Sequence, residues 1–201
     1  MLDYHLVFPL VEKDPHLGDI FDRLPVLDWD DLFRGMPHTR FGLVHPTAVI
    51  GSRVTIGEGT TVGPFAVIED DCIIGERCEI RSHALIRART VIGNQCVIGH
   101  GAEIKHVYLC AGAKIQGHTF VGDSIIGRGS RIGTGVVIAN RRFDQQPVAW
   151  RGPDGQIANT QDKVGALIGD YARLGANVST NPGVIIGAYT WVSSGNIVTG
   201  F

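Results

Sequence analysis

The sequence predicts an all-β protein, a single-stranded parallel β-helix of hexapeptide repeats about seven coils long. Apolar residues recur at every sixth position without interruption from Ile50 to Ile104. Four places after each of the first nine stands a small residue, mostly Ala, Thr or Cys, and Gly often follows the aliphatic residue directly. A period of six fits neither an α-helix nor a β-hairpin. It is typical of a solenoid in which each unit forms one short strand and one turn, and stacked coils bury a shared narrow core.

Residues 1–43 carry no hexapeptide phase and are expected to form a short N-terminal cap, partly helical and partly irregular. His5 to Val11 predicts a short strand, and Gly18 to Leu24 a brief helix. Asp28 can cap a second helix, which Gly35 would end. Because exposed strand edges at the end of a solenoid invite self-association, we expect this segment to cover that end.

The β-helix domain is expected to span residues 44–201, with one interruption. After Ile104 the phase slips by one residue and then slips again, so the next inward positions are Leu109, Ile115, Val121, Ile126, Ile132 and Ile138. Such slips mark corners where a coil is shortened, and irregular backbone often lies near a functional site. From Arg141 to Lys163 the pattern vanishes. A long excursion without regular structure is usually either functional or disordered, and we favour a functional loop here. The repeat resumes at Ile168.

Composition narrows the class of protein. The 201 residues suffice for one substantial domain, and 27 glycines with only 7% aromatic residues fit tight coils. A net charge of −2 without a basic run gives no electrostatic footprint for nucleic acid. No apolar run reaches membrane-spanning length, and the first residues lack a secretion signal, so we expect a cytoplasmic protein without a membrane partner.

Three of the four cysteines, Cys72, Cys78 and Cys96, stand at the small inward position of the repeat. Cys78 and Cys96 are eighteen residues apart, which places them at the same corner of adjacent coils. A cysteine at such a place is first of all a small apolar residue. The sequence has no C-x-x-C pair, which favours this role over a zinc site or a disulfide.

Arg87 and Lys105 form the most suggestive charged pair. They are eighteen residues apart, each directly after an inward aliphatic residue, so they should face outward on adjacent strands about 4.8 Å apart. Two cations this close repel unless something negative lies between them. Either both side chains splay apart on a solvated face, or they form an anion site, most naturally for a phosphate.

A file of histidines is expected along one corner, made by His83, His100 and His118, with His106 close by past the phase slip. Each alone is consistent with a surface residue. Together they suggest a general base or a metal site. Nucleophile motifs such as G-x-S-x-G and glycine-rich phosphate loops are absent from the sequence.

Several phrases in the second half of the chain are more specific than the repeat. They are Ala102-Glu103-Ile104-Lys105-His106, Phe120-Val121-Gly122-Asp123-Ser124-Ile125-Ile126-Gly127, Gly133-Thr134-Gly135, Ala139-Asn140-Arg141-Arg142-Phe143-Asp144, Lys163-Val164-Gly165-Ala166-Leu167-Ile168-Gly169-Asp170 and Pro182-Gly183-Val184-Ile185-Ile186-Gly187. On these phrases the segment 103–198 resembles the left-handed β-helix domain of bifunctional sugar-1-phosphate nucleotidylyltransferase/amino-sugar-1-phosphate acetyltransferases, archaeal relatives included. The earlier coils resemble hexapeptide acyltransferases at large, including the lipid A acyltransferases.

The resemblance implies a homotrimer that binds acetyl-CoA in grooves between subunits, takes an amino sugar phosphate as acceptor and needs no metal for transfer. The family's basic sugar-phosphate pair falls on Arg87 and Lys105, and one of its two site asparagines on Asn140. The other asparagine becomes Arg131, and the site tyrosine becomes Phe120. The nucleotidylyltransferase half has no counterpart in this sequence, so a separate nucleotidyltransferase is a possible partner.

The catalytic histidine of the family falls on Gly117 in an ungapped alignment, with His118 one place later. The leading hypothesis is a CoA-dependent acyltransferase in which His118 takes the proton of the attacking amine while Arg87 and Lys105 hold the phosphate. The second is a sugar-phosphate-binding or trimerisation module without turnover, because the standard histidine, tyrosine and one asparagine are all replaced. The third is a γ-type carbonic anhydrase, for which the histidine spacing fits less well.

Overall fold

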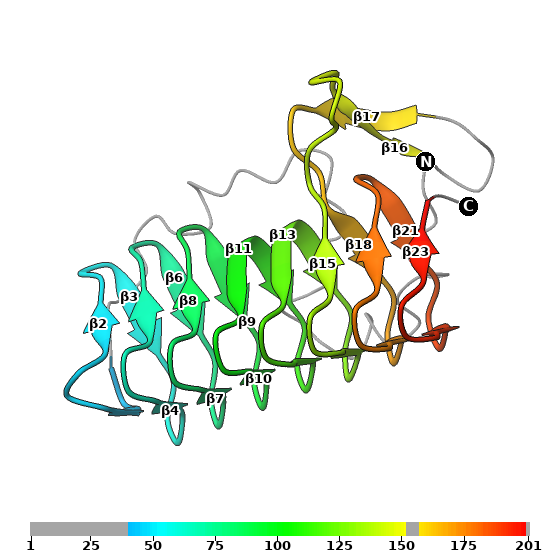
Figure 1. Ribbon diagram of the computed structural model, residues 1–201. Helices are drawn as coiled ribbons and strands as arrows, with labels where there is room; N and C mark the ends of the chain where they lie inside the picture. The colour runs from blue at the N-terminus through cyan, green and yellow to red at the C-terminus, as the bar shows by residue number, and fades with distance from the viewer. Residues whose placement is uncertain (1–39, 152–156, 200–201) are drawn as a thin grey trace.

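The computed structural model describes residues 40–151 and 157–199, which form one elongated parallel β-helix (Figure 1). The predicted all-β fold class is confirmed. Eight strands follow one another along a single face, which corresponds to about eight coils where the sequence predicted about seven. The described coils begin at Arg40, which bridges to Ile56, four residues before the predicted domain start. The strand and helices expected before Gly35 lie outside the described residues.

Three faces make up each coil. Face 1 consists of β1 (Leu43–Val44), β4 (Thr61–Val62), β7 (Glu79–Ile80), β10 (Val97–Ile98), β12 (Lys114–Ile115), β14 (Arg131–Ile132), β19 (Arg173–Leu174) and β22 (Trp191–Val192). Face 2 consists of β2 (Val49–Ile50), β5 (Val67–Ile68), β8 (Leu85–Ile86), the first parts of β11 (Glu103–Leu109) and β13 (Phe120–Ile126), then β15 (Val137–Ile138), β20 (Ser179–Thr180) and β23 (Ile197–Val198).

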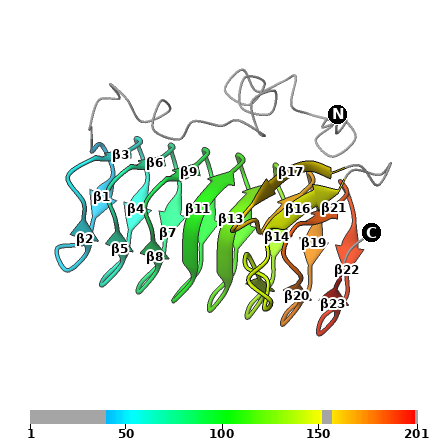
Figure 2. The same cartoon turned by 90° about the horizontal axis from the view of Figure 1, so that it is seen from above.

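Face 3 consists of β3 (Val54–Ile56), β6 (Cys72–Ile74), β9 (Thr90–Ile92), the last parts of β11 and β13, β18 (Ala166–Ile168) and β21 (Val184–Ile186). All the strands of the three faces pair in parallel. Seen from above, they stack in a regular column (Figure 2). No helix among the described residues has the length and hydropathy required to cross a bilayer.

The core is the predicted stack of aliphatic residues. The inward positions from Ile56 to Ile104 are at most 2% exposed, and the shifted positions from Leu109 to Ile138 are fully buried. All four cysteines are buried free thiols, and the peptide N–H of Cys78 donates to Thr60 Oγ1 in the coil below. The hexapeptide phase and both of its slips are therefore confirmed.

The phase slips both occur at one corner, between face 2 and face 3. Ile86 pairs with Ile104 eighteen residues on, but Ile92 pairs with Leu109 only seventeen residues on, so one residue is lost between them. The next coil loses its residue at the same place within β13. Each shortened coil passes the corner as one continuous seven-residue strand. We call this corner, with residues 105–107, 122–124 and 140, the short corner.

The excursion at 141–163 leaves from the same corner in the third coil. It is partly regular, which corrects the expectation of a loop without regular structure: β16 (Val148–Arg151) and β17 (Ile157–Gln161) pair as an antiparallel hairpin. Its end is fastened to the short corner, where the N–H of Val164 donates to the carbonyl of Asn140 and the N–H of Gly165 to that of Asp123.

Candidate functional site

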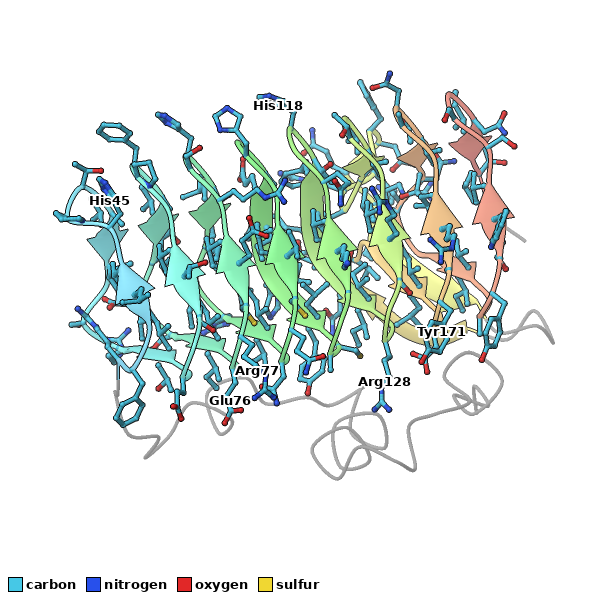
Figure 3. The ribbon with its side chains drawn as sticks, turned by 90° about the horizontal axis from the view of Figure 1, so that it is seen from below. His45, Glu76, Arg77, His118, Arg128 and Tyr171 are labelled. Carbon is cyan, nitrogen blue, oxygen red and sulfur yellow. The ribbon has the colours of Figure 1, made fainter. Side chains whose placement is uncertain are left out.

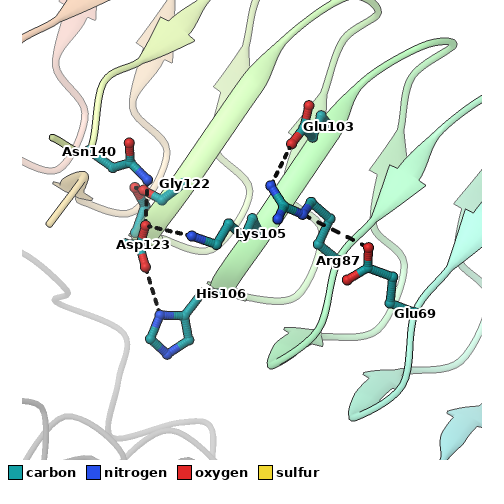
Figure 4. A network of polar contacts seen from close by, with 9 residues as sticks. Glu69, Arg87, Glu103, Lys105, His106, Gly122, Asp123 and Asn140 are labelled. Carbon is teal, nitrogen blue, oxygen red and sulfur yellow. Dashed lines mark hydrogen bonds and ion pairs between the residues drawn. The ribbon is translucent and has the colours of Figure 1, made fainter. Parts of the chain in front are cut away.

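Loss of one residue in two successive coils brings chemically active side chains together at the short corner. Lys105 pairs with Gly122 across β11 and β13, and the following residues, His106 and Asp123, both adopt a left-handed backbone with φ of 54° and 47°. Asn140 follows β15 at the same corner of the next coil. Because the three coils stack directly, these side chains lie above one another (Figure 4).

Asp123 is the centre of the cluster. Its Oδ1 lies 2.7 Å from His106 Nδ1, and its Oδ2 accepts a hydrogen bond of 2.5 Å from Asn140 Nδ2. The ammonium group of Lys105 lies 3.8 Å from Oδ2. The carboxyl side chain is only 9% exposed, so three polar groups from neighbouring coils converge on a nearly buried anion.

Gly122 makes this convergence possible. A Cβ atom at this position would lie 2.6 Å from Asn140 Nδ2 and 3.0 Å from Phe120 Cζ. The first distance is shorter than real Cβ contacts allow, so any side chain at position 122 would push Asn140 or Phe120 away. Phe120, which the resemblance places in the site, therefore lies against the same glycine as Asn140.

The environment of Asp123 keeps it ionised. Burial by itself raises the pKa of this carboxyl, but the hydrogen bonds with His106 and Asn140, together with the charge of Lys105, outweigh burial and hold the pKa below 3.8. An ionised carboxylate only accepts hydrogen bonds, so His106 must carry its proton on Nδ1. In that tautomer Nε2 is the ring atom that can accept a proton, and Nε2 is buried in the structure.

Arg87 and Lys105 are stacked as predicted, since the N–H of Arg87 donates to the carbonyl of Ile104 in the adjoining coil. The expected repulsion between them is relieved by carboxylates of the protein. Arg87 donates to Glu103 over 3.1 Å and lies 3.9 Å from Glu69, while Lys105 faces Asp123. The cations and carboxylates thus alternate along this edge of face 2 (Figure 4).

His118 lies at a different corner, between face 1 and face 2. Its ring packs edge-on against His100 at 5.2 Å between centroids, His100 packs against His83 at 5.4 Å, and His83 stacks on Phe65 at 5.1 Å. The predicted histidine file therefore exists, and we call it the histidine corner. His118 is exposed at its turn (Figure 3). Arg131 is also remote from the cluster, because it points outward from β14 on face 1.

The repeat pattern does not single out Asp123, and it places His106 only beside the histidine file. Both phase slips can be read from the sequence, and each shortens its coil to seventeen residues at the short corner. His106 and Asp123 are seventeen apart, as are Asp123 and Asn140. Counting with the shortened period would have stacked all three. A period of eighteen residues stacks Arg87 on Lys105 instead.

A metal site finds no support in this part of the chain. Among residues 40–151 and 157–199, no group of three or more His, Cys, Asp or Glu side chains is placed to hold a metal ion.

Known proteins resemble part of this chain. The sequence profile described as the GMPPB C-terminal domain matches residues 68–149. Over 96 residues the chain is 40% identical to the bifunctional sugar-1-phosphate nucleotidylyltransferase/acetyltransferase of Sulfurisphaera tokodaii, a match that covers 48% of this chain and 24% of the relative. The chain is a hexapeptide-repeat β-helix that resembles the C-terminal domain of these bifunctional enzymes.

This hexapeptide-repeat β-helix has further relatives. It is 41% identical over 88 residues to the putative uncharacterized acetyltransferase YaiX of Escherichia coli. This match covers 44% of the chain and 38% of YaiX. Among solved structures, PerB from Caulobacter crescentus, in complex with CoA and GDP-perosamine, aligns at 19% identity with a TM-score of 0.35, over 46% of this chain and 45% of PerB. The latter likeness concerns the fold alone. The chain spans well under half the length of the two curated relatives.

Proposed function

We propose that the protein transfers an acyl group, most simply acetyl, from CoA to the amino group of a sugar phosphate at the short corner. The observation that supports this most is the convergence on Asp123 of a histidine and a lysine from the coil before it and an asparagine from the coil after it. Amide formation from a thioester needs a proton acceptor for the amine and polar groups that hold the acceptor substrate. The short corner brings a histidine and such polar groups together, and the proposal requires that the substrate amine reach Nε2 of His106, which is buried in this structure.

The phosphate of the acceptor is assigned to Lys105 and Arg87. The Lys105 side chain is 23% exposed, and its ammonium group lies 3.8 Å from Asp123, so a phosphate can attract it without breaking a tight ion pair. Arg87 is 40% exposed and already donates to Glu103. We therefore assign the larger share of phosphate binding to Lys105, with Asn140 and Phe120 as further contacts of the sugar.

The proton acceptor is assigned to His106, with His118 as the alternative that the sequence suggested. The substrate amine attacks the thioester carbonyl, a C–N bond forms, and Nε2 of the histidine takes the proton that the nitrogen loses. The C–S bond then breaks, the thiolate leaves as CoA, and the imidazolium returns its proton to that sulfur. Asp123 stabilises the transient imidazolium through Nδ1 without itself being protonated.

Assembly into a homotrimer belongs to the same proposal. The outward side chains of face 2 include Val49, Val137 and Ile197, which are 62%, 44% and 70% exposed. Exposed apolar side chains aligned along one flat face favour contact with further copies of the chain. Acyl-CoA would then lie in the groove between neighbouring subunits.

A second candidate function is a binding or trimerisation module without turnover. Two observations favour it. His118, which directly follows the place where the family's catalytic histidine falls, lies at a corner remote from Lys105. Phe120 stands where the family has tyrosine. In that case the short corner would bind a sugar phosphate, and His106 would only hold Asp123 in place.

The test is release of free thiol from acetyl-CoA by the purified protein, with glucosamine 1-phosphate and related amino sugar phosphates as acceptors. Glucose 1-phosphate, which lacks the amine, is the matched control. Thiol release that requires the amine supports acyl transfer. Saturable binding of both sugar phosphates without thiol release supports the binding module instead.

A further inference from the structure

The outward surface of face 3 is apolar, unlike that of face 1. Side chains alternate between the two sides of a strand, so the residue between two inward positions points away from the core. On face 1 these outward residues include Glu79, Lys114 and Arg131, which are exposed. On face 3 the outward residues from β6 to β21 are apolar and pair in direct register: Ile73, Val91, Tyr108, Ile125, Leu167 and Ile185. We call these six residues the outer apolar ladder.

Four adjacent residues of the ladder are buried although they point away from the core. They are Val91 at 8% exposure, Tyr108 at 5%, Ile125 at 4% and Leu167 at 2%. Among the described strands, only those of the β16–β17 hairpin lie outside the three faces, and the hairpin contacts face 3 at β21. It lies over the C-terminal coils (Figures 1 and 2), whereas β9 is four strands from β21. The burial of Val91 and Tyr108 therefore requires a further covering element.

The composition of residues 1–39 matches this surface. The segment holds five of the 15 Phe, Trp and Tyr residues of the chain. It also holds eight acidic and three basic residues, a net charge of −5, and since the whole chain carries −2, the rest carries +3. Arg89 directly precedes β9 and Arg128 closely follows β13, so cations border the ladder. An apolar and acidic segment is thus complementary to an apolar strip with a basic border.

The segment also joins the solenoid at the right place. Arg40 forms a parallel bridge with Ile56 on β3, and the N–H of Phe41 donates to the carbonyl of Ile56. The segment therefore meets the described chain at the first strand of face 3. From β3 to β21 the face measures about 29 Å, which is six strand spacings of about 4.8 Å. A chain of 39 residues measures about 58 Å even at the rise of an α-helix, so it can reach the whole ladder.

We infer that residues 1–39 dock along the outer apolar ladder and cover the outside of face 3. Docking removes apolar side chains of the ladder and of the segment from water, and it brings acidic residues of the segment to the bordering arginines. This placement differs from a cap over the open end of the solenoid, because Val91 and Tyr108 lie two and three strands inside the face from β3. The inference does not depend on acyl transfer.

Limited digestion of the full-length protein with trypsin tests whether the segment is docked. Trypsin cleaves after lysine and arginine, and the segment contains Lys13, Arg23 and Arg34. Mass spectrometry follows the rate of cleavage at each of these sites. A synthetic peptide of residues 18–39 gives the rate for the same sequence without the β-helix. Cleavage after Arg23 and Arg34 should be at least about tenfold slower in the protein than in the peptide.

Two ladder variants test where the segment docks. Ile125→Asp and Val91→Asp each place a charge in the ladder, at different coils, and a charge buried without a partner opposes docking. Val97→Asp is the matched control, because Val97 points outward from β10 on face 1 and the substitution makes the same change of net charge. Circular dichroism verifies the β-helix of each variant. Cleavage of the segment should accelerate at least about tenfold in the ladder variants and stay at the wild-type rate in Val97→Asp.

Three results would overturn the inference. The first is cleavage of the wild-type segment as fast as that of the peptide, which decides the matter even if a ladder variant does not fold. The second is a wild-type rate of cleavage in folded Ile125→Asp or Val91→Asp, which would place the segment elsewhere. The third is protection of the wild type that disappears on dilution, which would assign the ladder to a second copy of the chain.

Discussion

The short corner and the histidine corner belong to the same coils, yet they treat histidine differently. At the histidine corner, three exposed imidazoles pack against one another along the solenoid. Among the described residues, no carboxylate forms an ion pair with any of the three. At the short corner one histidine meets one nearly buried carboxylate, with Asn140 and Lys105 on the other carboxylate oxygen.

The difference follows from one missing residue in each of two coils. A regular six-residue phase repeats the same side-chain position at every level and produces files of like residues. Removing a residue at one corner turns the backbone there and stacks side chains of different kinds, seventeen residues apart. Side chains of different kinds can therefore meet at the short corner, whereas at the histidine corner the imidazole rings stack on one another.

Substitutions at the two corners should differ most in their effect on the turnover of acyl transfer. Asp123→Asn removes the negative charge that fixes the tautomer of His106, so turnover should fall by about a hundredfold. Asp71→Asn is the matched control, because Asp71 occupies the same kind of left-handed position but pairs with Arg53 rather than a histidine. Steady-state thiol release measures both, and equal activity of Asp123→Asn and the wild type would contradict the role of the pair.

The second largest difference between the two corners should be in the binding of a sugar phosphate. Lys105→Ala should weaken glucosamine 1-phosphate binding by at least about tenfold, since a charge-assisted contact is lost. Arg87→Ala should weaken it in the same direction. Arg81→Ala serves as control because Glu79 already holds that guanidinium at 2.9 Å. Titration calorimetry gives the three affinities, and equal binding by the wild type and Lys105→Ala would remove the anion site.

Much of this architecture could be read from the sequence, because hexapeptide periodicity depends only on which residues face inward. Ile56 to Ile104, both phase slips and the stack of Cys78 on Cys96 follow from that pattern alone. The pairing of His106 with Asp123 could not be read in the same way, since it depends on which corner absorbs each missing residue. Nor does the pattern describe the hairpin of β16 and β17, whose pairing is antiparallel and outside the repeat.

The core beneath both corners is shared, so a change there should affect them equally. Cys78→Leu adds volume at a position that is 2% exposed, and overpacking should cost about 1–3 kcal/mol in the free energy of unfolding. Cys78→Ala should cost less. Denaturant melts of both variants measure this. A Cys78→Leu midpoint equal to that of the wild type would contradict the assigned phase.

A smaller effect should appear in the pH dependence of stability. The pKa of Asp123 lies below its ordinary value of 3.8 in the folded protein, so its contribution is fully present above pH 3.8 and is lost as pH falls through the lower folded-state pKa. The difference in unfolding free energy between the wild type and Asp123→Asn should therefore shrink below about pH 4. Asp144→Asn is the control, because Asp144 pairs with Arg142 at the surface, where solvent screens the interaction. A wild-type advantage over Asp123→Asn that does not change with pH would contradict this contribution.

The most direct test of whether the short corner is the site compares His106→Ala with His118→Ala in the acetyl transfer assay, with glucosamine 1-phosphate affinity measured in parallel. We expect His106→Ala to lower turnover by about a hundredfold while phosphate affinity stays nearly constant, since proton transfer acts in the transition state. His118→Ala should retain wild-type turnover. The opposite result, with activity lost in His118→Ala and kept in His106→Ala, would place the catalytic base at the histidine corner and contradict a site at the short corner.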